Sequence, residues 1–290
     1  MSAVSEPVPI RTAWQPLTPP GVAAFAGASL RRLALAQFVF AVLAAAVVVW
    51  FLQTAWLPTL REAIGQLPAQ GAIRGGVLDW PGTSPHLLAA GRFLAFSVDV
   101  EHTGDLRSPA QIELEFGRAT LRIYSLFGYT ELGYPADGNF AFNQPELEPW
   151  WGAWTPPILW LAFGAVLAGL PAAWSVLATL YFLPAWLTAY FANRDLSLAG
   201  AWKLAGAAQL PGALLLTTAI FCYGFGGLDL VKLLAAFGAH WLCSWIFLAA
   251  AVVARPKLSS TAGVRENPFA HPAPVEPTPV EKTETNLSPD

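Results

Sequence analysis

Charged residues are scarce in this chain. They make up 12% of its 290 residues, whereas soluble domains contain about 25%. The stretch 150–193 contains no Asp, Glu, Lys or Arg, and hydrophobic residues account for 55% of the whole chain. Charge-free windows of this length exclude an ordinary soluble protein, because they indicate that lipid surrounds part of the chain. The sequence therefore predicts an integral membrane protein.

Cysteine is rarer still, with two residues in the whole chain. Cys222 and Cys243 both lie in apolar runs and residues 61–149 contain none, which excludes a disulfide framework in that polar segment. The chain also lacks a Walker glycine loop, a CxxC pair, an HExxH motif and a GxSxG motif. We therefore expect no cofactor. The net charge of −3 and the lack of a basic stripe argue against nucleic acid as a partner.

The first apolar run comprises 28 uncharged residues directly after Arg31 and Arg32. About 20 residues are enough to cross the hydrocarbon core of a bilayer. The run is longer than the apolar part of a cleaved signal peptide, so we expect an uncleaved signal anchor over 31–60. Two segments rich in proline and polar residues are predicted to be disordered, the leader 1–30 and the tail 255–290.

Residues 61–149 differ from the rest, with acidic residues and frequent glycines and prolines. Polar and apolar residues alternate there with a period of two, which is typical of half-buried strands. The segment 71–80 is predicted to supply a further strand, with Gly75 and Gly76 at a turn or bulge. The segment therefore predicts a small antiparallel β-rich domain, held at both ends by membrane helices. The alternating stretches are 92–101, 111–116 and 119–127.

The charge-free stretch 150–193 is too long for one simple crossing. As a helix it would measure roughly 66 Å, twice what a bilayer needs. One interpretation is a single span over about 157–182 that breaks at Pro184, with 185–193 lying along the inner interface. The alternative is a hairpin that turns at 169–171, which adds a fifth span.

Basic residues decide between these two topologies. Loops on the cytoplasmic side carry an excess of Lys and Arg, and a single crossing places all the flanking basic pairs on one side. The predicted fold is thus a membrane protein, a helical bundle of four (alternatively five) transmembrane helices with an inserted small antiparallel β-rich extracytoplasmic domain. We expect it in the bacterial inner membrane with both termini cytoplasmic. The basic pairs are Arg31/Arg32, Arg194/Lys203 and Arg255/Lys257. The spans after the β domain lie in the membrane block 150–254, over about 157–182, 204–228 and 233–254.

Few residues suggest chemistry. Asp99, Glu101 and His102 cluster at the end of a strand, and a loop rich in carboxylates is a candidate site for a divalent cation. Their spacing matches no known calcium loop, however, and a turn there needs polar residues anyway. Asp229 and Lys232 lie one turn apart and are best explained as a local ion pair in an external loop.

His240 is the histidine of the last apolar run. A histidine inside a membrane is a candidate proton relay or ligand, and Cys243 lies one turn further on, with Cys222 in the preceding run. Packing against neighbouring groups explains all three residues as well. We predict no metal site.

Three short stretches resemble a bacterial family of integral membrane proteins of uncharacterised function, some members of which are linked to maltodextrin utilisation. The likeness covers roughly residues 33–254, and the membrane block is also similar in outline to Yip-type multi-span proteins. The resemblance implies one anchor, an external β-rich domain and a helical block, and it brings no known catalytic residues. The matching residues are Gly76-Val77-Leu78 in AIRGGVLDW, Asp99, Thr103 and Gly104 in FSVDVEHTG, and Ala207, Leu210 and Pro211 in LSLAGAWKLAGAAQLPGALL.

The scarcity of polar groups inside the apolar runs favours a non-enzymatic protein. We expect a sensing, interaction or accessory protein that acts through its extracytoplasmic β domain. Its expected partners are the lipid bilayer and other membrane proteins or further copies of itself. One alternative is a transporter subunit with a cavity lined by kinked helices. A second is an envelope enzyme with its site in the β domain.

Overall fold

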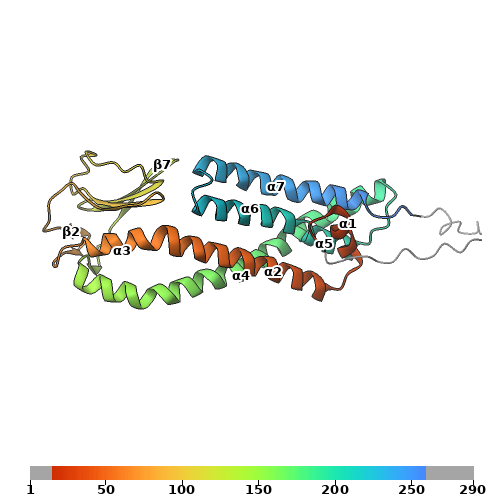
Figure 1. Ribbon diagram of the computed structural model, residues 1–290, viewed down its shortest axis with the longest axis horizontal. Helices are drawn as coiled ribbons and strands as arrows, with labels where there is room; N and C mark the ends of the chain where they lie inside the picture. The colour runs from red at the N-terminus through yellow and green to blue at the C-terminus, as the bar shows by residue number, and fades with distance from the viewer. Residues whose placement is uncertain (1–14, 259–290) are drawn as a thin grey trace, which may run out of the picture.

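The computed structural model describes residues 15–258, which form an elongated molecule with a β domain at one end of a bundle of long helices (Figure 1). The two ends of the described chain lie at the far end of the bundle. Within the described residues, four helices are long and apolar enough to cross a membrane, by length and composition. Apolar helices and β sheets are thus combined as the sequence predicts. The four helices are Leu30–Gly65, Gln144–Phe191, Leu198–Gly224 and Leu230–Val253.

The first long helix continues directly into the β domain. α2 (Leu30–Phe51) passes through a π-helical turn, η2 (Leu52–Trp56), into α3 (Leu57–Gly65). The turn lies just before Pro58, whose ring removes a backbone donor, and π turns are a common way for a helix to accommodate such a defect. α3 then buries an apolar stripe against the sheets.

The β domain contains two sheets, which pack with α3 around one apolar core. The larger has the order β3-β4-β5-β6-β7 and the smaller the order β2-β1-β8. Gly75 and Gly76 form the β1–β2 turn with φ values of 56° and 77°, a region that favours glycine. The strands are β1 (Ala72–Arg74), β2 (Val77–Asp79), β3 (His86–Ala90), β4 (Leu94–Val98), β5 (Ile112–Phe116), β6 (Thr120–Ser125), β7 (Gly128–Gly133) and β8 (Asn139–Ala141).

Strand pairing departs from the predicted antiparallel domain at one place. β4 and β5 are parallel, with Leu94 opposite Ile112 and Val98 opposite Phe116. Parallel neighbours need a crossover of about a dozen residues, and the segment 99–111 supplies it. The prediction was wrong here because polar–apolar alternation reports the period of a strand and not the direction of its neighbour.

The second long helix, α4 (Gln144–Phe191), is a single helix of 48 residues. It neither breaks at Pro184 nor turns at 169–171, so both interpretations of this stretch need correction. Ala185 and Ala189 are 4% and 1% exposed and belong to a buried core with α5 (Leu198–Ala207). This packing stabilises the helical backbone on both sides of Pro184, a residue type that would end an isolated helix.

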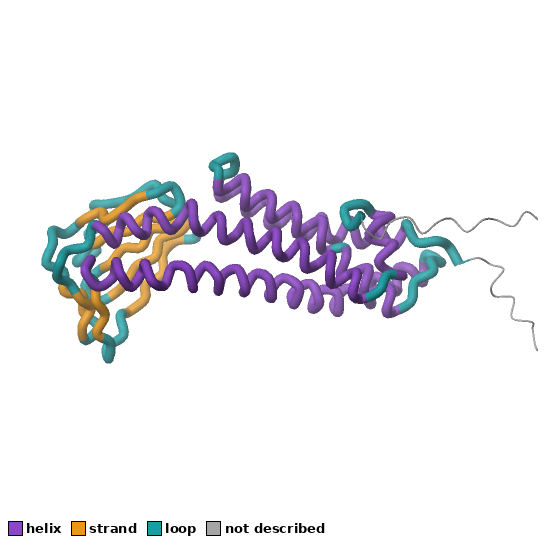
Figure 2. Tube along the Cα trace, turned by 60° about the horizontal axis from the view of Figure 1, so that its bottom comes forward, coloured by secondary structure: helices purple, strands orange, loops and turns teal. Residues whose placement is uncertain are grey.

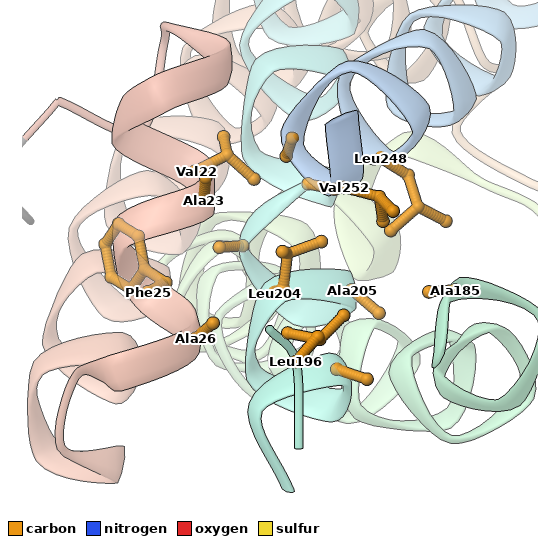
Figure 3. Close-up of a cluster of buried hydrophobic side chains, with 14 of the residues drawn as sticks. Val22, Ala23, Phe25, Ala26, Ala185, Leu196, Leu204, Ala205, Leu248 and Val252 are labelled. Carbon is orange, nitrogen blue, oxygen red and sulfur yellow. The ribbon is translucent and has the colours of Figure 1, made fainter. Parts of the chain in front are cut away.

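The bundle end away from the β domain has its own core, shown in Figure 3. α1 (Pro19–Ala24) and a 3-10 turn, η1 (Phe25–Gly27), insert Val22 and Phe25, which are 0% and 1% exposed, beside α5 and α7 (Leu230–Val253). This part of the predicted disordered leader is therefore folded, because Thr18 caps α1 and its two prolines occupy the first turn, where a missing N–H costs nothing. Residues 1–14 and 259–290, also predicted to be disordered, lie outside the described residues.

The third long helix joins two elements, α5 and α6 (Gln209–Gly224), and therefore begins and ends earlier than the predicted span 204–228. α6 then packs closely on α7. At Gly212 a side-chain Cβ would lie 2.4 Å from the carbonyl oxygen of His240, so only glycine permits this approach.

Candidate functional site

Buried charge is concentrated where the 99–111 crossover covers β5. Asp99, Glu113 and Glu115 are 2%, 4% and 1% exposed. Removing a carboxylate from water is costly, so each needs hydrogen bonds or an opposite charge. The partners come from the crossover itself and from the strands on either side of β5, which the sheet order brings together. We call these three carboxylates and their partners the carboxylate network.

Glu115 lies at the centre of the carboxylate network. Its Oε1 is 2.6 Å from Nδ1 of His102, and its Oε2 accepts a hydrogen bond from Nη1 of Arg107 at 3.1 Å. The Tyr124 hydroxyl donates to Oε1 at 3.3 Å. The Arg107 guanidinium also lies 4.0 Å from the centre of the Tyr124 ring. One glutamate thus joins the crossover to β6 through three side chains.

His102 extends this network to a hydroxyl group. Its Nε2 is 3.0 Å from Oγ1 of Thr120. The residue has a left-handed φ of 53°, and its ring lies so close to Gly117 that a Cβ there would be 2.0 Å from Nε2. A carboxylate, an imidazole and a hydroxyl in this order can relay a proton. The same contacts also attach the crossover to β5, through Glu115, and to β6, through Thr120.

The other two carboxylates are held by neutral donors. Oδ2 of Asp99 accepts from the Thr103 hydroxyl and the Gly104 backbone N–H, both at 2.9 Å. Burial acts to raise the pKa of Asp99, but these hydrogen bonds and the nearby His102 outweigh it and hold the pKa below its ordinary value of 3.8. Glu113 accepts from the Ser97 hydroxyl at 3.0 Å and from a backbone N–H at 3.1 Å.

The structure separates the residues that the sequence groups together in this domain. Asp99 and His102 belong to the carboxylate network, but Glu101 is 70% exposed and pairs with Arg118 on the surface at 3.5 Å. Among residues 15–258, no group of three or more His, Cys, Asp or Glu side chains is arranged to hold a metal ion. The geometry therefore gives the divalent-cation hypothesis no support.

Asp229 and Lys232 lie at the start of α7. Asp229 lines a cavity of about 450 Å³ there, together with Glu113 and Tyr124 of the carboxylate network. Oδ1 of Asp229 caps the helix by accepting from the Lys232 backbone N–H at 2.8 Å, and the two side chains form an ion pair at 2.9 Å. The backbone and side-chain hydrogen bonds from Lys232 lower the pKa of Asp229. The expected local ion pair is therefore present, and it stabilises a helix terminus.

His240 lies inside the bundle. Together with Gln209, Thr217 and Ser244 it lines a cavity of about 220 Å³ between α2, α4, α6 and α7. Its Nδ1 bonds the carbonyl oxygen of Phe237 one turn earlier. The hydroxyls of Thr217 and Ser244 bond carbonyls of their own helices, which is the usual way for such groups to be satisfied in an apolar layer.

Sequence reasoning missed most of the carboxylate network. Glu113 and Glu115 appear in the sequence as the polar face of an amphipathic strand, yet they are the most buried side chains of β5. The available signal was the segment between β4 and β5, which is too long for a hairpin and so predicts a crossover over one face of β5. Arg107, Thr120 and Tyr124 gave no signal of their own.

Comparison of the chain with family models, with curated proteins and with solved structures finds no match. The resemblance to the family of uncharacterised membrane proteins therefore stays a prediction, and the proposals below rest on the geometry alone.

Proposed function

We propose that this chain is a four-span protein of the bacterial inner membrane, with both termini in the cytoplasm and the β domain on the extracytoplasmic side. Charge placement supports this orientation. Arg31 begins α2 at the bundle end far from the β domain, and there Lys203 Nζ donates to the Ala28 carbonyl at 2.7 Å. At the same end, Arg194 Nη1 donates to the Arg255 carbonyl at 2.8 Å. Basic residues of this kind stay on the cytoplasmic side.

We propose that the β domain is a sensing or interaction module. One observation carries this proposal: the domain is built onto two helices that continue without a break from the apolar bundle (Figure 2). Ala63 of the first helix and Leu147 of the second both belong to the domain core. Arg92 Nη2 also donates to the Leu228 carbonyl at 2.8 Å, which ties the domain to the α6–α7 connection. A ligand or partner that shifts the domain would therefore move the helices with it.

The edge strand β7 is the surface on which we expect a protein partner to bind. All six of its residues are exposed, including the large side chains Tyr129 and Leu132 at 61% and 49%. An uncovered edge presents free peptide groups that can pair with a strand of another chain. A second copy of this protein or another membrane protein would fit this role.

The transporter alternative has one observation in its favour, the cavity beside His240. Uptake of a solute by the purified protein in liposomes would promote that alternative over ours. The expected result is no uptake, together with cross-linking of a partner to a photoreactive residue at Leu132 on β7. A probe at Leu87, which is exposed on the opposite edge of the sheet, serves as the control.

The orientation is tested separately, by cysteine accessibility in a chain lacking Cys222 and Cys243. We expect Tyr129→Cys to react with an impermeant maleimide in intact cells, and Leu198→Cys to react only after permeabilisation. Labelling of Leu198→Cys from outside would invert the proposed topology.

A further inference from the structure

An apolar cavity of about 170 Å³ lies where the two long helices enter the β domain. Leu60 and Ala63 of α3 form one wall, Leu147 and Trp151 of α4 form another, and Phe96 belongs to the sheet that closes it. Every lining residue is aliphatic or aromatic. Such a cavity offers nothing to orient a sugar or a peptide, whereas apolar cavities of about 150 Å³ stay dry and accept apolar guests.

A second cavity of about 250 Å³ adjoins the first. We call it the polar cavity because its wall, although largely apolar, contains the charged side chains Arg61 and Glu148. It is lined by Arg61, Ile64, Glu148, Trp151 and Gly152, and it shares Ile64 and Trp151 with the apolar cavity. The indole Nε1 of Trp151 is buried without a hydrogen-bond partner in the described part of the chain. Arg61 likewise makes no hydrogen bond or ion pair within residues 15–258. A buried donor without an acceptor is costly, and the exposed Arg61 guanidinium is free to pair with an anion. The indole and the guanidinium together point to a ligand that brings its own oxygen atoms.

The two cavities lie at the depth where both helices leave the apolar layer. Arg61 is the first charged residue after Arg32, and Glu148 is the last before Arg194. Three tryptophans follow directly at 150, 151 and 154, and this residue type concentrates at the level of lipid head groups. The polar cavity therefore faces the head-group layer, and the apolar cavity extends from it into the domain.

We propose that the paired cavities bind one zwitterionic amino-phospholipid, of the phosphatidylethanolamine class, from the extracytoplasmic leaflet. The end of one acyl chain occupies the apolar cavity, whose volume of about 170 Å³ leaves no room for a second chain. The phosphate pairs with Arg61 and accepts the indole hydrogen of Trp151, while the ammonium group pairs with the Glu148 carboxylate. Phosphatidylglycerol and a free fatty acid each lack the ammonium group. Either would leave Glu148, which accepts a hydrogen bond from Gln144 at 3.1 Å, beside an anion and without a cation.

The proposal rests on the membrane location of the module and names its ligand. A lipid held between α3 and α4 would couple the composition of the membrane to the position of the β domain. Lipid binding by the purified protein in detergent does not depend on its orientation in the membrane. A negative binding result would therefore overturn this proposal without affecting the topology, which the cysteine-accessibility experiment tests.

The test is native mass spectrometry of the delipidated full chain, titrated with phosphatidylethanolamine, phosphatidylglycerol or palmitate. We expect tight binding of one phosphatidylethanolamine. Trp151→Phe removes the indole donor with its five-membered ring and keeps an aromatic side chain in the wall. It should weaken binding at least about fivefold, the value of one hydrogen bond of about 1 kcal/mol. Arg61→Gln should weaken it about tenfold or more, whereas Arg74→Gln, an exposed arginine elsewhere in the domain, should have no effect.

Ala63→Phe fills the apolar cavity and should abolish binding, whereas Ala165→Phe on the exposed face of α4 should not. If Ala63→Phe lowers thermal stability, the Trp151 and Arg61 variants decide the outcome. Glu148→Gln should remove the preference for phosphatidylethanolamine over phosphatidylglycerol. Equal binding of the three lipids by the unaltered chain, preferential binding of palmitate, or unchanged affinity in Trp151→Phe and Arg61→Gln would overturn the proposal.

Discussion

Replacement of Glu115 by alanine should unfold the β domain far more readily than the same change at Glu101. Both glutamates form an ion pair, but the Glu115 side chain is 1% exposed and that of Glu101 is 70% exposed. Loss of Glu115 leaves His102, Arg107 and Tyr124 without their shared acceptor. The two variants, Glu115→Ala and Glu101→Ala, thus compare the loss of a buried network with the loss of a surface contact in the same domain.

The magnitude follows from the exposure of each partner. The bonds from His102 and Tyr124 contribute about 1 kcal/mol each. Nδ1 of His102, whose side chain is 14% exposed, loses its acceptor, and this costs a further 1–3 kcal/mol or so. Arg107 is 48% exposed and can turn to water, so its share is below about 1 kcal/mol. The sum is about 3–5 kcal/mol, as expected for breaking a buried charged contact. Removing Glu101 should cost less than about 0.5 kcal/mol.

Hydrogen exchange of the full chain in detergent measures this difference for the β domain alone. A loss of about 3–5 kcal/mol should speed exchange of the β5 and β6 amides by roughly two to four orders of magnitude. The helices at the far end of the bundle serve as an internal reference. Similar, small accelerations in Glu115→Ala and Glu101→Ala would refute the idea that the carboxylate network holds the domain together.

Three further changes test other parts of the structure. Gly212→Ala places a Cβ 2.4 Å from the His240 carbonyl and should cost about 1–3 kcal/mol, measured as a lower Tm in detergent. Gly164→Ala, where a Cβ meets open space, should leave the Tm unchanged. Equal Tm values for the two variants would contradict the close α6–α7 contact. Asn143 is 7% exposed and caps α4, so Asn143→Ala should cost about 1–2 kcal/mol of stability. It should also speed hydrogen exchange of the amides in the first turn of α4. Unchanged exchange of those amides would contradict the role of the cap. The pKa of Asp99 is lower in the folded chain than its ordinary 3.8, so the carboxylate stabilises the domain above pH 3.8, and this stabilisation is lost as the pH falls further. In acid unfolding, Asp99→Asn should lack this pH-dependent loss of stability. Identical acid-unfolding profiles for the two chains would contradict the assignment.

Much of the fold was predictable because its signals are local. Runs of apolar residues longer than a bilayer is thick indicate spanning helices wherever they occur. Alternation of polar and apolar residues indicates the strands β4, β5 and β6. The ion pair of Asp229 and Lys232 follows from their spacing on one helix. Each of these inferences needs only a few neighbouring residues.

The candidate site was less predictable, because it forms from segments distant in the sequence. Asp99 and His102 were recognised as a polar cluster, but Glu113 and Glu115 become buried only when the crossover folds over β5. The same limit applies to the paired cavities, since Arg61 and Trp151 are 90 residues apart in the chain and meet only where α3 and α4 enter the domain. No pattern within a short stretch of sequence indicates that two such distant residues lie close together.

The amino-acid sequence by itself determined that this chain combines long apolar helices with a polar domain of short strands, because hydrophobicity and its period act within each segment. Only the tertiary structure decided that α4 continues through Pro184, that β4 and β5 run in parallel and that two glutamates of a polar strand face are buried. In each case contacts between distant segments outweighed the local preference. Packing against α5 stabilises the helix beyond its proline, and the hydrogen bonds of the crossover compensate for the burial of charge.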